Sequence, residues 1–363
     1  MITFYPGPSK VYPQVATYLQ DAMNEGILSQ NHRSLAFMDM LKECITVFKK
    51  KQNIPEDYTV YFTSSATECW EIVSQSLVKK HSHHVYNGAF GEKWFEYASK
   101  LNKQTTSTKF DFQKHFGING KLFNEVLPSG AAAAAEDLGG ASDLLCFTQN
   151  ETSNATQITL DFLNYTNHKS LTAIDVTSSL GGIELDWKLG DIWLASVQKC
   201  LGLPAGLGVM ICSPRAIERA VEIGERNHYN SFLFMHENFQ KYQTHYTPNV
   251  LSIYLLMRVM QQVPDIQVVS KKTKARISDF YDFVKAKTAL KLLIEKQEIR
   301  SDTVIAIKGT VEEITALKQK AKENDVILGN GYGEWKDTTF RIANFPAIED
   351  WEFEKLKSIL CNI

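Results

Sequence analysis

An aspartate and a lysine, Asp175 and Lys199, stand 24 residues apart, and each follows an apolar run of the sequence. The runs cover residues 171–176 and 191–197. Continuous apolar runs predict strands covered on both faces of a sheet, and functional side chains gather where such strands end. A partly buried lysine loses its proton readily enough to attack a carbonyl carbon, and a nearby carboxylate stabilises a protonated ring nitrogen.

Pyridoxal phosphate (PLP) needs both of these groups. A lysine amine holds its aldehyde carbon as a Schiff base, and a carboxylate keeps its pyridine nitrogen protonated so that the ring accepts electrons. The spacing alone leaves two simpler explanations open. Asp175 could cap the turn after its strand, and Lys199 could be a surface lysine.

The residues around this pair resemble the signature of the class V, fold-type I PLP-dependent aminotransferases, in particular the phosphoserine and alanine/serine–glyoxylate branches. Ser178 and Ser179 follow the aspartate, Gln198 precedes the lysine, and the loop 204–208 matches the phosphoserine branch. A glutamine before the lysine favours aminotransferases over cysteine desulfurases, which carry histidine there. The resemblance implies a homodimer with shared active sites, in which Lys199 also moves the substrate's α-proton.

A phosphate site is expected where residues 58–62, a predicted strand, lead into a helix. The first helical amides and the positive end of the helix dipole bind anions, so Ser65, Ala66 and Thr67 fit the cofactor phosphate. A capping box between Ser65 and Glu68 is the structural alternative, and both can hold together.

Further cofactor contacts come from the resemblance alone. It implies that Phe90 stacks on the PLP ring and that Thr152 binds the ring oxygen. It also implies that Thr247 reaches the phosphate in the partner subunit, although Thr247 could equally cap the next helix. The complete predicted cofactor set is Ser65, Ala66, Thr67, Phe90, Thr152, Asp175, Ser178, Gln198, Lys199 and Thr247.

Three residues are candidates for binding substrate. An arginine forks around a carboxylate or phosphate, and Arg341 on a predicted strand matches the family's group for the α-carboxylate. A structural salt bridge is its alternative. His32 and Arg33 match a pair that reaches a substrate phosphate across the dimer, although they could also be a helix-entry cluster. Thr67 stands where the phosphoserine branch has arginine, which puts a phosphorylated substrate in doubt.

The composition excludes several classes of protein. A formal charge of −2 gives no basic surface for nucleic acid or anionic membrane. The six cysteines have no metal-ligand spacing, no apolar run approaches about 20 residues, and the start of the chain lacks a signal segment. We therefore expect a soluble cytoplasmic protein with free thiols and no metal. His81, His83 and His84 are interpreted as a solvated strand entry rather than a metal cluster.

The predicted architecture is an α/β fold of fold type I. A large domain (14–260) with a mixed, mostly parallel seven-stranded sheet follows an extended arm (1–13) and precedes a small α+β domain (261–363). The alanine run 131–135 is compatible with a helix start or a surface loop. The loop 329–333 resembles a nucleotide loop only weakly, since we expect no core strand before it.

The sequence thus predicts a ping-pong aminotransferase that moves an amino group from phosphoserine or serine to a 2-oxo acid, most like phosphoserine:2-oxoglutarate transfer. A serine/alanine–glyoxylate (pyruvate) aminotransferase and a non-catalytic protein on the same fold remain alternatives. A desulfurase is disfavoured because no cysteine lies between Cys212 and Cys361. A nicotinamide dehydrogenase is disfavoured because no GxGxxG follows an early strand.

Overall fold

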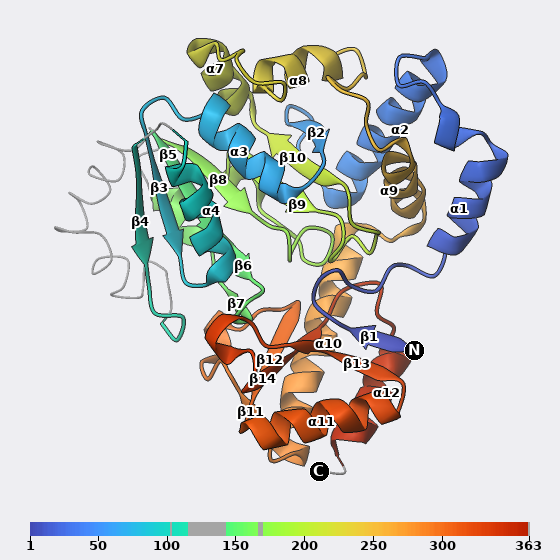
Figure 1. Ribbon diagram of the computed structural model, residues 1–363, viewed down its shortest axis with the longest axis vertical. Helices are drawn as coiled ribbons and strands as arrows, with labels where there is room; N and C mark the ends of the chain where they lie inside the picture. Colours follow the sequence, from blue (N-terminus) through green and yellow to red (C-terminus); the bar gives the residue numbers. More distant parts are fainter. Residues whose placement is uncertain (102–103, 115–142, 166–169, 362–363) are drawn as a thin grey trace.

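The computed structural model describes residues 1–101, 104–114, 143–165 and 170–361. The alanine run 131–135 lies outside these residues. Two sheets organise the described chain, a large one in the upper part of Figure 1 and a smaller one below it near the amino terminus.

The larger sheet has seven strands, and four of its six strand pairs are parallel. The strand β10 is antiparallel to both of its neighbours. This confirms the predicted mixed, mostly parallel sheet. In sheet order the strands are β2 (Thr59–Thr63), β10 (Gly208–Cys212), β9 (Ile192–Ser196), β8 (Leu171–Asp175), β5 (Leu144–Thr148), β3 (His81–Tyr86) and β4 (Gln104–Lys109).

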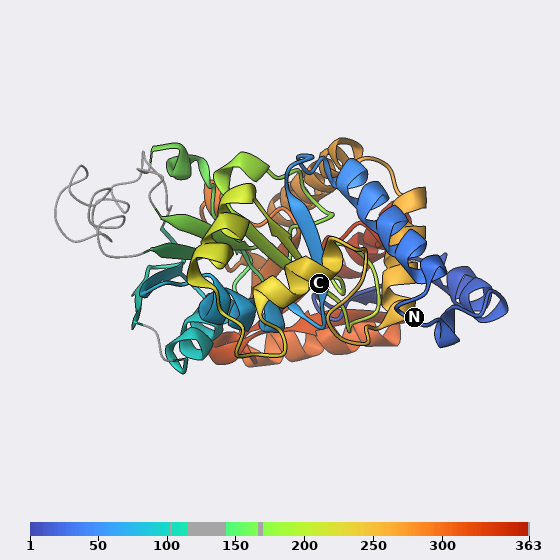
Figure 2. The ribbon, with the colours of Figure 1, turned by 90° about the horizontal axis from the view of Figure 1, so that it is seen from above.

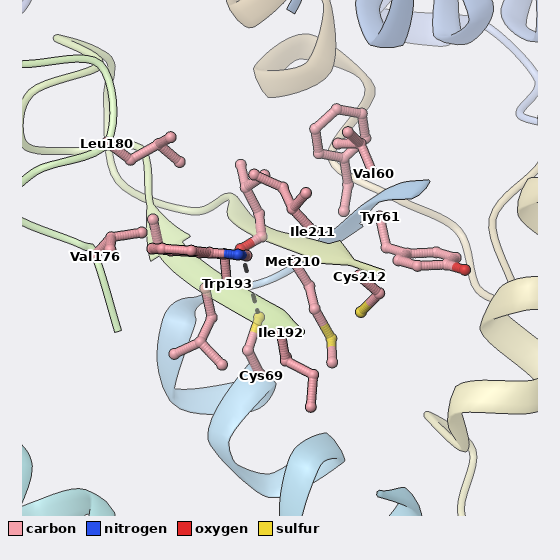
Figure 3. Close-up of a cluster of buried hydrophobic side chains, with 14 of the residues drawn as sticks. Val60, Tyr61, Cys69, Val176, Leu180, Ile192, Trp193, Met210, Ile211 and Cys212 are labelled. Atoms are coloured by element: carbon pink, nitrogen blue, oxygen red, sulfur yellow. Dashed lines mark hydrogen bonds between the residues drawn. The ribbon is translucent and has the colours of Figure 1, made fainter. Parts of the chain in front are cut away.

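Helices pack on both faces of this sheet (Figures 1 and 2). Apolar side chains of β9, β10 and the neighbouring helix α3 contribute to the core between the sheet and the helix. Figure 3 shows Cys69 of α3 facing Ile192 and Met210. Trp94 is buried. The helices are α1 (Val15–Asn24), α2 (Leu35–Gln52), α3 (Ala66–Ser76), α4 (Ala89–Ser99), α7 (Pro214–Ile223), α8 (Phe232–Phe239) and α9 (Val250–Gln262).

Helix boundaries follow capping residues in the sequence. Helix α2 begins after Ser34, whose hydroxyl accepts a hydrogen bond from the amide of Phe37 (3.2 Å), and it ends at Asn53 in the left-handed region. Asparagine tolerates that conformation better than most residues. Helix α9 begins after Asn249, whose side chain accepts from the amide of Ser252 (3.0 Å). The alternative in which Thr247 caps this helix is therefore wrong.

The smaller sheet unites the two ends of the chain. The strand β1 pairs in parallel with β13, and the order is β1-β13-β14-β12-β11. Our expectation that no strand precedes the loop 329–333 is wrong, because β13 leads into it. The elements are β1 (Ile2–Phe4), α10 (Ile266–Lys287), β11 (Lys291–Leu292), β12 (Val304–Lys308), α11 (Val311–Glu323), β13 (Val326–Asn330), β14 (Thr339–Ala343) and α12 (Asp350–Leu360).

Short elements complete the described chain. They are η1 (Ile27–Ser29), β6 (Asn150–Glu151), β7 (Thr156–Gln157), η2 (Asp161–Tyr165), η3 (Trp187–Leu189), η4 (Gln297–Ile299) and η5 (Gly333–Trp335). Within the described ranges, no helix is both long and apolar enough to cross a membrane. All six cysteines are free, and only Cys361 is exposed.

Candidate active site

The site lies at the carboxyl edge of the large sheet. The parallel strands β8 and β9 end there side by side, with Asp175 opposite Leu194. Lys199 follows three residues after the end of β9. The predicted proximity of Asp175 and Lys199 is therefore observed, because the charge of each group shifts the pKa of the other.

The amine of Lys199 is enclosed by polar and aromatic groups. Its Nζ donates to Oγ1 of Thr152 (2.7 Å) and to Oγ of Ser178 (3.0 Å), and lies 4.9 Å from the centre of the Phe90 ring. Thr152 and Ser178 also bond to each other. Burial lowers the pKa of Lys199 to about 8, although the negative charge of Asp175 opposes this shift. The lysine is thus a buried amine that loses its proton at a lower pH than an exposed lysine does, not a surface lysine.

The carboxylate of Asp175 is buried and held in place from two sides. Its Oδ2 accepts from the indole Nε1 of Trp70 (2.9 Å), and its Oδ1 accepts from the amide of Thr177 (2.8 Å). Burial raises its pKa, while these hydrogen bonds and the charge of Lys199 oppose the increase. The bond to Thr177 is the turn-capping contact considered above, and Trp70 is a partner that the sequence did not indicate.

The start of α3 reaches the same edge from β2. Ser65 accepts from the amide of Glu68 (3.1 Å), and the amide of Ala66 donates to Oγ of Ser196 (2.7 Å). The carboxylate of Glu68 accepts from the amide of Ser64 (2.7 Å), one residue before the expected partner. A reciprocal cap of this kind holds the helix start, and Thr67 is exposed there.

Arg341 comes from the smaller sheet and faces Thr152. Its Nε donates to the carbonyl of Asn330 (2.7 Å), and its Nη1 donates to the carbonyl of Thr152 (2.8 Å). In the described part of the chain we find no carboxylate in a salt bridge with Arg341, so the salt-bridge alternative is not observed. A buried guanidinium with neutral partners remains able to bind an anion.

A cavity of about 410 Å³ opens between Lys199, Arg341 and the amino-terminal arm. The hydroxyl of Ser9 donates to the carbonyls of Gln198 (3.1 Å) and Lys199 (3.2 Å), which fixes the arm against the loop after β9. Gly7 has a φ of +149°, and an added Cβ there would lie 3.1 Å from Cε of Lys199. The arm therefore forms one wall of the cavity.

Of the predicted site residues, Phe90, Thr152, Gln198, Lys199 and Arg341 line this cavity, whereas Ser65, Ala66, Thr67, Asp175 and Ser178 do not. Three others, Arg33, His32 and Thr247, lie elsewhere on the chain. Arg33 is exposed, and its Nη1 donates to the side-chain oxygens of Asn238 (3.0 Å) and Gln243 (2.6 Å). His32 lies beside it, and Thr247 is exposed before α9. None of the three lines the cavity.

Glu151 is a buried residue whose part in the site the sequence did not reveal. Its carboxylate accepts from the amides of Phe90 (3.1 Å) and Gly91 (3.2 Å) at the start of α4, and from the amide of Ser153 (3.0 Å). A carboxylate at a helix amino terminus is favoured by the helix dipole. Burial nevertheless raises the pKa of Glu151. Glu151 thus fixes the backbone that presents the Phe90 ring to Lys199.

Two histidines of β3 bond to the neighbouring strand, whereas His84 is buried and bonds to Ser82 of its own strand, so the interpretation as a solvated strand entry is wrong for His84. His81 and His83 both bond to Oγ1 of Thr106, at 2.7 and 2.8 Å. Burial lowers the pKa of His83 to about 4 and that of His84 to about 3. Across the residues that the structure describes, no group of three or more histidine, cysteine or acidic side chains is placed to hold a metal ion.

Comparison with known proteins adds independent information. The family model described as aminotransferase class-V matches residues 4–331. A phosphoserine aminotransferase from Corynebacterium glutamicum is 26% identical, over 96% of this chain and 91% of its own length.

Solved structures agree with this match. A phosphoserine aminotransferase from Cytophaga hutchinsonii superposes with a TM-score of 0.89 at 30% identity, over 99% of this chain and 98% of that one. The alanine–glyoxylate aminotransferase from Nostoc superposes with a TM-score of 0.80 over 99% of this chain and 94% of that one. Its identity of 18% makes the second likeness one of fold alone.

Proposed function

The chain belongs to the class-V aminotransferase family, and we propose that this transaminase uses PLP and takes phosphoserine or serine as its amino donor. The observation that carries the proposal is the convergence on one cavity of a buried amine with a lowered pKa, an aromatic face and a buried guanidinium. The acceptor we propose is a 2-oxo acid, 2-oxoglutarate before others.

The residues present fit the cofactor by their chemistry. Asp175 is a buried carboxylate able to hold a proton on a ring nitrogen, Lys199 is a buried amine, and the Phe90 ring faces that amine. The start of α3 carries the positive end of the helix dipole, which favours an anion. When bound, PLP supplies an electron sink that stabilises negative charge at the α-carbon of an amino acid.

Each protein group has a distinct task in this proposal. Lys199 holds the cofactor and, once free, takes the α-proton of the donor and returns it as a general acid. Asp175 maintains the ring nitrogen in its protonated form, and Phe90 stacks on the ring. Thr152 and Ser178 accept hydrogen bonds from the amine in the structure; Thr152 would bind the ring oxygen, and Ser178 would also contact the cofactor. The phosphate is held by Ser65, Ala66, Thr67 and Gln198, with Thr247 from the other subunit.

The cavity favours an anionic substrate. Arg341, Lys199 and Lys336 line it, and none of the described residues that line it is an aspartate or a glutamate. We assign the α-carboxylate to Arg341, because two parallel N–H groups fix a carboxylate and therefore the α-carbon attached to it.

The second charge of the donor separates two candidates. His32 and Arg33 support a phosphorylated donor, as do the relatives named phosphoserine aminotransferase. The uncharged Thr67 at the start of α3 supports serine or alanine, with glyoxylate or pyruvate as the acceptor.

A homodimer is part of the proposal. In one chain Arg33, His32 and Thr247 lie away from the cavity beside Lys199, so their proposed tasks require a second subunit. We also propose the division into an arm (1–13), a large domain (14–260) and a small domain (261–363), and a cytoplasmic location.

A half-reaction titration tests the function. Purified protein with PLP should absorb near 400–430 nm (a rough range for PLP bound to lysine), and its true donor should bleach this band. Phosphoserine, serine, alanine and glutamate are compared at equal concentration. Lys199→Ala should abolish both the band and turnover, whereas Lys188→Ala, on an exposed lysine, should change neither. A Lys199→Ala protein that still transaminates would refute the assignment, and a coloured protein bleached by no donor would favour the non-catalytic alternative.

A further inference from the structure

A tight loop between β13 and β14 places one aromatic side chain at the mouth of the cavity. Tyr332 stands between Gly331 and Gly333. A Cβ on Gly331 would lie 2.0 Å from the carbonyl oxygen of Trp335, and Gly333 has a φ of +56°. The backbone thus requires glycine at Gly331 and favours it at Gly333, and the loop presents Tyr332 in a defined position.

Tyr332 contacts two residues of the site. Its ring centre lies 5.3 Å from that of Phe90, with the planes inclined at 38°. The guanidinium of Arg341 lies 5.5 Å from the centre of the same ring. Tyr332 therefore separates the residue proposed to stack on the cofactor from the residue proposed to bind the carboxylate.

The phenol of Tyr332 is held from the other side of the cavity. Its oxygen accepts from Nζ of Lys93 (2.6 Å), which lies on α4 one turn after Phe90. The ammonium also lies 5.4 Å from the centre of the Tyr332 ring. Helix α4 packs on the large sheet and the loop belongs to the small one (Figure 1), so this contact joins the two parts of the chain across the cavity.

We propose that Lys93 and Tyr332 form a latch, a pair of positioning residues that holds the loop 331–336 over the cavity and keeps Arg341 aimed at the substrate carboxylate. The substrate part of this inference rests on the proposed function. The mechanical part rests on contacts alone, since Arg341 is anchored by carbonyls on both sides of the cavity and its aim depends on their separation. Without the Lys93–Tyr332 contact, the guanidinium keeps its hydrogen bonds to the carbonyls of Asn330 and Thr152, but the two parts of the chain that carry these carbonyls are held together less firmly.

Hydrogen exchange tests the mechanical part without substrate. Three loop amides have backbone partners: Gly331 to Thr339, Trp335 to Tyr332 and Lys336 to Gly333. In the PLP-loaded protein, Lys93→Met should raise exchange of these amides about three- to tenfold, as expected for loss of a cation–π and hydrogen-bond contact. Lys93→Arg should restore part of the protection.

The same helix offers a matched control. Lys100 at the end of α4 lies 5.1 Å from the ring centre of Tyr97, outside the cavity, so Lys100→Met removes a similar contact from the same element. It should leave exchange of the loop unchanged. Equal loop exchange in the Lys93→Met and wild-type proteins would overturn the latch, whether or not the protein proves to be a transaminase.

Binding of maleate, a dicarboxylate without an amino group, tests the link to Arg341. Calorimetry on the PLP-loaded protein should give a Kd about three- to tenfold higher for Lys93→Met and Tyr332→Phe than for wild type. The KM of the donor should rise by a similar factor while kcat changes less than about twofold, because the chemistry at Lys199 is untouched. Faster loop exchange with unchanged maleate affinity and KM would overturn the positioning role. A wild-type protein that takes up no PLP would instead refute the proposed function, and exchange in that protein would still decide the latch.

Discussion

The lowered pKa of Lys199 gives a prediction that can be measured without any cofactor. Burial moves this pKa from 10.5 to about 8, and the charges of Asp175 and Glu151 keep it from falling further. Asp175→Asn removes one of those negative charges, while the asparagine oxygen can still accept from Nε1 of Trp70. The pKa of Lys199 should therefore decrease below its wild-type value, and the neutral, nucleophilic amine should persist to lower pH.

The expected effect is large because only the neutral amine reacts. At pH 7 a lysine with a pKa of about 8 is roughly 10% neutral, against about 0.03% for one at 10.5, a difference of about 300-fold. Each further pKa unit adds up to about tenfold. The direction of the pH dependence is fixed: the reactivity of Lys199 rises as the pH passes through the pKa of this residue in the folded protein, and then levels off.

Pulsed acetylation with acetic anhydride measures this titration. The protein is first freed of bound ligand with hydroxylamine and dialysed, then labelled briefly between pH 5 and 11, and the peptide containing Lys199 is quantified by mass spectrometry. In the wild-type protein Lys199 should show a labelling midpoint near pH 8, whereas surface lysines should have a midpoint at about pH 10.4. Asp175→Asn should shift the Lys199 midpoint to lower pH. A wild-type midpoint at or above pH 10, or an upward shift in Asp175→Asn, would refute the account of the site's electrostatics.

Two further predictions concern the support of Phe90. In Gly88→Ala the new Cβ would lie 2.3 Å from Cγ of the buried Glu151. Urea unfolding should therefore show a free energy of unfolding lower by about 1–3 kcal/mol, which is typical of overpacking. An unchanged free energy of unfolding would mean that the Glu151 side chain can move aside. In Glu151→Ala the amides of Phe90 and Gly91 lose their acceptor, which should cost about 1–3 kcal/mol. Glu151→Gln keeps one acceptor and should cost less, and an equal loss in the two variants would contradict a hydrogen-bonding role.

Strands buried on both faces were predictable to within one residue at each end. The predicted runs 171–176, 191–197 and 58–62 correspond to β8 (Leu171–Asp175), β9 (Ile192–Ser196) and β2 (Thr59–Thr63). The polar strand β4 was not expected because it lies at the edge of the sheet, where β3 is its only partner among the described strands, and an edge strand needs no apolar pattern. The strand β1 was missed for another reason, since its partner β13 lies more than 300 residues further along the chain.

The same distinction between local pattern and distant contact separates the site residues that could be predicted from those that were missed. Asp175, Lys199 and Arg341 stand at the ends of, or within, recognisable strands, and their proximity follows from strands that meet at one edge. Trp70 and Glu151 were missed because their contribution is a contact with an element distant in sequence. No local pattern distinguishes a buried carboxylate that holds a helix start from one that pairs with a lysine.

The formal charges of the buried site balance across the two sheets. Asp175 and Glu151 carry two negative charges, and Lys199 and Arg341 carry two positive ones; all four side chains are buried. Burial raises the pKa of both acids and lowers the pKa of both bases, so each charge is costly by itself and is compensated by the others. Asp175 ends β8 of the large sheet and Lys199 follows its strand β9, whereas Glu151 lies on β6 of the two-stranded sheet and Arg341 on β14 of the small sheet. Packing of the large and small sheets against each other therefore completes both the charge balance and the cavity. An anionic substrate beside Arg341 would change this balance, so substrate binding and the pKa of Lys199 should depend on each other.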